Sequence, residues 1–198
     1  MLSAATATVT LLASGVVPAQ TPASPEKPRD FSPIERPVDP ERAKVERADE
    51  ALRDSQGGQI TDPTVFVKSA ALGALAEIAL AKLAQSKSQD AGVRSFAARM
   101  LKDFEAIRSE LAAVAKRQRL DVPTSLVYED EQVVNEGAEK SGAGFDAWYA
   151  DRMLTEHQRA IALFQSAAQM DDTALAELAR KTLPTLDEHL RMASRLRE

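Results

Sequence analysis

Three titratable side chains, Glu77, His157 and His189, stand on otherwise apolar helical faces of this 198-residue chain. At the positions three and four residues away, Glu77 has only glycine, alanine and leucine, and both histidines have mainly aliphatic neighbours. An isolated buried carboxylate is costly, so we expect Glu77 to have a partner. The chain contains only two histidines, so these imidazoles are the natural candidates.

Two kinds of chemistry are open to this set. Carboxylate and imidazole groups on facing helices can bind a divalent metal such as zinc, iron or manganese. Alternatively, Glu77 accepts hydrogen bonds from one or both histidines, and the network fixes the register of the helices without any cofactor. We take the metal-free network as the first expectation. A helix register in which Glu77, His157 and His189 never meet stays open as well.

No catalytic motif accompanies the three residues. A di-iron carboxylate site would need glutamate three positions before each histidine, but Leu154 and Leu186 stand there. The chain has no nucleophile elbow, no phosphate-binding glycine loop, no H-E-x-x-H motif and no cysteine. Two acids near the apolar stripes, Asp103 and Glu156, have arginines at helical spacing, so surface ion pairs are the better account of them. We therefore predict no catalytic residue.

The hydrophobic residues recur at alternating spacings of three and four, which predicts an all-α fold. Four long helices are expected, over 62–86, 91–118, 144–169 and 172–197. Short links within the first and second pairs favour two antiparallel hairpins. The long segment 120–143 joins the pairs, contains a short helix through Val133 and Val134, and has room to run back along the bundle. This pattern predicts a ferritin-like four-helix bundle with one long crossover between the second and third long helices.

The N-terminal part differs in composition from the rest. Residues 1–19 contain no charged residue, and Val17 and Ala19 fit the small-x-small pattern before a secretory cleavage site. We interpret residues 1–19 as a signal peptide, although a basic segment near the start is missing and a disordered cytosolic tail is the alternative. Residues 20–60 are expected to be a proline-rich linker with a short charged helix over 41–56. The bundle domain is expected over 61–198.

The charge and hydropathy of the chain restrict its partners. The formal net charge is -5 and basic residues are spread among acidic ones, which disfavours a nucleic-acid partner. The apolar part of the N-terminus, Val9 to Val17, is too short for a membrane span. We also expect no transmembrane segment in the mature chain. An unknown protein or another component of the cell envelope is the expected partner.

Four sequence blocks, in order and spacing, resemble the bacterial domain-of-unknown-function family 4142: FVKSAALGALAEIALAKLA, FAARMLKDF, FDAWYADRMLTEHQRAIALF and TLPTLDEHLRMA. The resemblance covers about residues 62–196. It implies an exported or outer-membrane protein with a ferritin-like helical bundle, and it implies no particular reaction. Glu77, His157 and His189 match the glutamate and two of the histidines of that family.

One position departs from the family pattern, which usually has Asp-His where this chain has Asp103-Phe104. If the histidines of the family bind a metal, the resemblance implies that this chain has lost one ligand. A site of Glu77, His157 and His189 could still bind zinc with water as the fourth ligand.

The sequence therefore predicts an exported, periplasmic or cell-envelope protein with a non-catalytic role. That role is expected to be structural, stress-related or in interaction with a partner. The alternative is a metal-binding protein, with or without redox activity, that uses Glu77, His157 and His189. A third hypothesis is a partner-binding module that uses residues 41–56 as a detachable amphipathic segment.

Overall fold

The computed structural model describes residues 60–198. Within that range the chain forms five helices and no strand: α2 (Pro63–Lys87), α3 (Ala91–Gln118), α4 (Tyr128–Glu139), α5 (Gly142–Ala167) and α6 (Thr173–Arg195). The all-α prediction is confirmed, and the short helix expected around Val133 and Val134 is present as α4. The expected signal peptide, linker and 41–56 helix lie outside the described residues.

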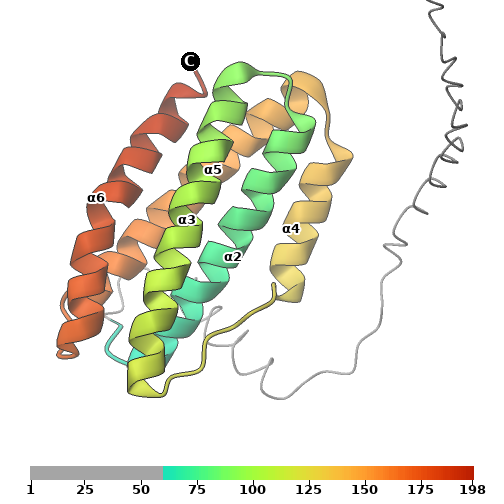
Figure 1. Ribbon diagram of the computed structural model, residues 1–198. Helices are drawn as coiled ribbons and strands as arrows, with labels where there is room; N and C mark the ends of the chain where they lie inside the picture. Colours follow the sequence, from blue (N-terminus) through green and yellow to red (C-terminus); the bar gives the residue numbers. More distant parts are fainter. Residues whose placement is uncertain (1–59) are drawn as a thin grey trace, which may run out of the picture. The chain divides into compact units, whose positions relative to one another are not determined.

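The four long helices pack in two hairpins, α2 with α3 and α5 with α6 (Figure 1). Contacts of α2 with α5 and of α3 with α6 close the arrangement around one core. The helix α4 lies along α2, between the end of α3 and the start of α5 (Figure 1). The first turns of α3 and α5 and the last residues of α6 line one common hollow, so α3 and α5 begin at the same end of the bundle.

Aspartate caps set the start of three of the long helices. The side chain of Asp62 accepts a hydrogen bond from the Thr64 amide at 2.7 Å, and Pro63 occupies the first helical position. Asp90 and Asp172 cap α3 and α6 in the same manner. These caps satisfy backbone amides that have no partner inside the helix, so the helix starts are encoded locally.

The core combines small residues on α2 with larger ones on the other helices. Alanines of α2 such as Ala71, Ala81 and Ala84 are fully buried, which allows neighbouring helices to approach closely. The largest fully buried side chains include Tyr149, Phe66, Phe96, Phe145, Leu80, Met100 and Leu111. Within this apolar interior every polar group must find a partner or lose its charge.

Among the described helices, α2 alone is long and apolar enough to cross a membrane, with a mean hydropathy of 1.6 in its most apolar window. Half of that window is buried inside the protein. A core helix passes the same test of length and composition, so the hydropathy of α2 does not separate the two situations.

The helix α4 packs against the bundle at a glycine. Gly137 is the one buried residue of α4 and lies against the indole of Trp148 on α5 and against Leu83 on α2. The Lys87 ammonium donates a hydrogen bond to the Ala138 carbonyl at 2.5 Å. A side chain at position 137 would collide with the indole, so glycine allows the close approach of α4 to the bundle.

Candidate functional site

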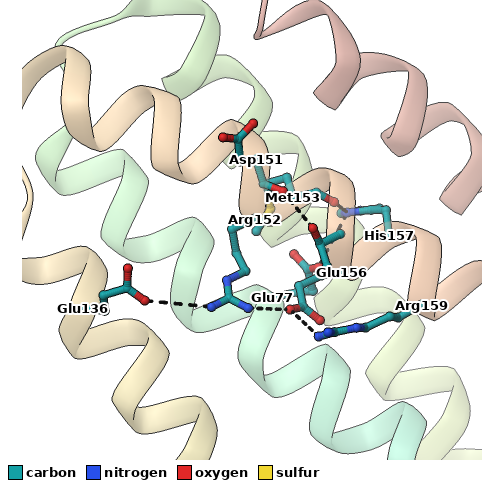
Figure 2. A network of polar contacts seen from close by, with 9 residues as sticks. Glu77, Glu136, Asp151, Arg152, Met153, Glu156, His157 and Arg159 are labelled. Atoms are coloured by element: carbon teal, nitrogen blue, oxygen red, sulfur yellow. Dashed lines mark hydrogen bonds and ion pairs between the residues drawn. The ribbon is translucent and has the colours of Figure 1, made fainter. Parts of the chain in front are cut away.

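Glu77 lies in the interior at the contact between α2 and α5 (Figure 2). Its side chain is 4% exposed, and neither carboxyl oxygen has a hydrogen-bond partner. One titratable neighbour is His157, whose Nδ1 lies 3.6 Å from Glu77 Oε1. The structure therefore brings Glu77 next to one of the two predicted histidines.

His157, on α5, is completely buried, and its surroundings determine which nitrogen carries the proton. Its Nδ1 lies 2.8 Å from the Met153 carbonyl oxygen. A carbonyl only accepts hydrogen bonds, so Nδ1 donates and Nε2 is left with a lone pair. That Nε2 is buried and has no partner. The 3.6 Å approach of Glu77 is thus a contact with a nitrogen already engaged elsewhere, rather than a second hydrogen bond.

His189, on α6, is fully buried and has the opposite tautomer. Its Nε2 lies 2.9 Å from the carboxylate oxygen Oδ2 of Asp103, so Nε2 carries the proton and donates it. The other nitrogen, Nδ1, is buried without a partner. Asp103 also pairs with Arg99, as the spacing predicted. Its second role, as acceptor for His189, was missed because the sequence does not tell which neighbouring helix faces Asp103.

The two imidazoles lie against each other. Their ring centroids are 5.4 Å apart with the rings nearly perpendicular, and the Phe104 ring lies 5.7 Å from each of them. Within residues 60–198, no hydrogen bond or ion pair joins Glu77 directly to His189. The predicted residues therefore form a chain from Glu77 to His157 to His189, with Phe104 beside both rings.

Burial determines the charge of this cluster. Burial raises the pKa of Glu77 well above its usual value; the negative charge of Glu156 adds to this effect and Arg152 opposes it. Burial lowers the pKa of His157 to about 4. Burial also lowers the pKa of His189, although the hydrogen bond to Asp103 acts in the opposite direction. At neutral pH both imidazoles are neutral. The raised pKa of Glu77 favours its protonated, neutral form over the carboxylate.

Tyr149 is a further polar group that the sequence interpretation did not single out. Its hydroxyl is buried without a hydrogen-bond partner. Burial raises the pKa of this phenol, and the nearby Glu77 carboxylate adds to the effect. A tyrosine in a stripe of core positions gives no signal in sequence that distinguishes it from a packed phenylalanine.

A chain of ion pairs covers the outside of the same region (Figure 2). Arg152 lies 3.0 Å from Glu156 on α5 and 4.0 Å from Glu136 on α4. Arg159 also contacts Glu156, at 3.2 Å. The prediction of surface ion pairs for Glu156 is confirmed, and Arg152 links the helix α4 to α5 just outside Glu77.

A family model described as domain of unknown function (DUF4142) matches residues 48–196 of the chain. The chain belongs to this family. The match includes all five described helices, α2 to α6, and it confirms the resemblance carried by the four sequence blocks. Membership in DUF4142 assigns no function, as the description of the family states. No curated protein and no solved structure matches the chain.

In this DUF4142 chain the three predicted residues offer donor atoms that suit a metal ion. Their side chains do not, however, converge on one point. The two Glu77 oxygens, His157 Nε2 and His189 Nδ1 are all free of hydrogen bonds, and imidazole and carboxylate are suitable ligands for zinc. However, no group of three or more histidine or acidic side chains among residues 60–198 has the geometry of a metal site. Glu77 contacts His157 and the two histidine rings contact each other, but Glu77 makes no hydrogen bond or ion pair with His189.

A separate hollow of about 560 Å³ lies at the end of the bundle where α3 and α5 begin. Asp146, Asp151, Arg195 and Arg197 contribute to its wall, and Asp151 and Arg197 pair with each other at 3.0 Å. None of Glu77, His157 and His189 lines it. This hollow therefore gives no access to the buried cluster of the DUF4142 fold.

Proposed function

We propose that this protein is an exported, non-catalytic helical bundle of the cell envelope, with a structural, stress-related or partner-binding role. The observation that carries the proposal is the burial of its titratable cluster. Glu77 is 4% exposed and His157 and His189 are completely buried. A general acid or base must come within hydrogen-bond reach of its substrate, and these groups lie beneath packed side chains.

A ferritin-like arrangement is the part of this proposal that concerns the fold. Two hairpins joined by a long crossover favour it, because the crossover with α4 allows α3 and α5 to begin at the same end. In simple up-down-up-down bundles, consecutive helices begin at opposite ends.

Export is supported by the uncharged N-terminal segment and the small-x-small pattern at Val17 and Ala19. The test is to fractionate cells that express the full chain with a C-terminal tag, and to sequence the N-terminus of the product. We expect an envelope fraction that begins at Gln20. The variant Leu12→Arg interrupts the apolar segment and serves as the control that should stay uncleaved in the cytosol. A wild-type chain with an intact N-terminus in the cytosol would contradict export.

The non-catalytic role is tested by complementation of a strain that lacks the gene, under envelope stress. Folded Glu77→Gln and His189→Gln variants should complement as well as the wild type, because the proposed role needs the outside of the bundle. Loss of complementation by variants with a native circular dichroism spectrum would indicate that the buried groups themselves perform the function.

A second candidate function is metal binding by Glu77, His157 and His189, with or without redox activity. It is favoured by the four donor atoms in the core that lack any hydrogen-bond partner. The measurement is the metal content of the protein purified from its native envelope without chelator. Near-stoichiometric zinc, iron or manganese that is lost in Glu77→Gln would support this function. Metal-free protein would leave Glu77 as a buried acid that sets helix register.

A further inference from the structure

Both histidines of the core have the hydrogen-bond arrangement that is typical of metal ligands. Ligating histidines usually donate their outer N–H to a carbonyl or carboxylate, which fixes the tautomer and leaves the other nitrogen free for the metal. His157 donates to the Met153 carbonyl, and His189 donates to the Asp103 carboxylate. Each ring is thereby fixed by a different type of acceptor, from its own helix in one case and from α3 in the other.

The other nitrogen of each ring carries a lone pair that accepts no hydrogen bond. His157 Nε2 and His189 Nδ1 are both buried and have no partner, and they belong to rings whose centroids are 5.4 Å apart. Two lone pairs cannot hydrogen-bond to each other, because neither has a proton to give. Buried polar atoms in native proteins are almost always satisfied, so these two lone pairs are available to an electron-pair acceptor.

From this arrangement we infer that His157 and His189 alone form the donor pair of a monovalent copper site; the inference rests on the metal-binding candidate function but leaves Glu77 out of the ligand set. Imidazole is a suitable ligand for copper. Cu⁺ has a filled d shell and can be bound by two ligands in a linear arrangement. The pair is neutral and enclosed by aromatic and aliphatic side chains, where the cost of burying an ion rises with the square of its charge. A monovalent ion is therefore favoured over a divalent one when Glu77 does not take part.

Phe104 explains why the site has only two ligands. Its ring lies 5.7 Å from each imidazole, so it occupies the place from which α3 could supply a third ligand. Phe96 provides a comparison on the same helix, because its ring lies 6.4 Å from His157 and makes no ring contact with His189. A ligand introduced at position 104 would reach both histidines, whereas one introduced at position 96 would meet a single ring.

The test is a titration of the metal-free full chain with Cu⁺ under anaerobic conditions, in competition with a chromophoric chelator. We expect one copper ion per chain, retained in Glu77→Gln and lost in His189→Gln. Asp103→Asn should weaken binding by about 10- to 100-fold, the usual effect of removing the outer partner of a ligating histidine. Circular dichroism establishes that each variant has folded.

The outcomes separate this inference from the function on which it rests. If Glu77→Gln also loses copper, or if the chain binds only divalent ions through Glu77, the two-histidine site is wrong and the three-residue site stands. If the wild type binds Cu⁺ no better than His189→Gln, the two-histidine inference is overturned; zinc binding that depends on Glu77 is then tested on the same samples.

A second arm tests the place assigned to Phe104. Phe104→His should create a three-nitrogen site and tighten zinc binding by at least about tenfold relative to the wild type. The matched control Phe96→His introduces the same side chain into the core beside only one histidine, and should give no such gain. Equal zinc affinity in the two variants would overturn the assignment.

Discussion

Two groups of ionisable side chains lie on opposite sides of α5, one at the protein surface and the other in the core. Outside α5, Arg152, Glu156 and Arg159 are partly exposed and joined by ion pairs. Inside, Glu77 and His157 are buried, and three of their four polar side-chain atoms have no partner. Glu156 and His157 are adjacent in the chain, yet one helical step separates a solvated ion pair from a core that excludes charge.

Position in the bundle, rather than residue type, therefore determines whether these side chains are ionised. In water the ionised forms are stable, and the ion pairs between them contribute little free energy. In the core, burial raises the pKa of Glu77 and lowers that of His157, so the neutral forms are favoured in both cases.

The largest expected effect concerns the pH dependence of stability. His157 has a pKa of about 4 in the folded protein against 6.5 when unfolded, so the unfolded chain binds more protons between these values. This residue therefore stabilises the fold fully above pH 6.5 and progressively less as the pH falls to 4, with a loss of roughly 3 kcal/mol. Glu77 acts in the opposite direction, because its raised pKa gives stability below 4.5 that is lost as the pH rises.

Urea unfolding of wild type, Glu77→Gln and Glu77→Gln/His157→Gln between pH 4 and pH 8 separates the two contributions. Relative to the wild type, Glu77→Gln should become more stable as the pH rises, and it should show the steeper loss in acid. The double variant should lose less stability in acid than Glu77→Gln. Parallel curves for wild type and Glu77→Gln would mean that folding does not shift the pKa of Glu77.

The helices were predictable from the sequence because each long helix has a periodic apolar stripe, and aspartate caps fix the starts of α2, α3 and α6 locally. The burial of Glu77, His157 and His189 follows from the same stripes. Their contacts were not predictable, because the depth of each residue depends on how the helices slide along one another. Sequence spacing therefore did not show that Glu77 contacts His157 but not His189. It also did not show that Asp103 accepts a hydrogen bond from His189.

An intermediate effect is expected where α4 meets the bundle. In Gly137→Ala the added methyl would collide with the Trp148 indole and lie 2.9 Å from Leu83 Cδ2, so we expect destabilisation of about 1–3 kcal/mol. Gly73→Ala on α2 is the matched control, because its methyl meets nothing within 4 Å. The control should be stabilised by roughly 0.5–1 kcal/mol, since alanine favours a helix over glycine. Thermal unfolding of both variants measures the contrast, and equal melting temperatures would contradict the role of Gly137 in docking α4.

The smallest expected effect is on the outer ion pairs. Glu136→Gln removes the 4.0 Å pair with Arg152 and the 3.2 Å pair with Lys140 while keeping the size of the side chain. These groups are partly exposed and Arg152 keeps Glu156 as a partner, so the free energy of unfolding should fall by less than about 1 kcal/mol. The difference from the wild type should shrink further in high salt, because salt screens exposed charges. A loss of several kcal/mol that salt does not reduce would show that the Glu136–Arg152 link acts as a buried interaction, and the contrast between the inside and the outside of α5 would then no longer hold.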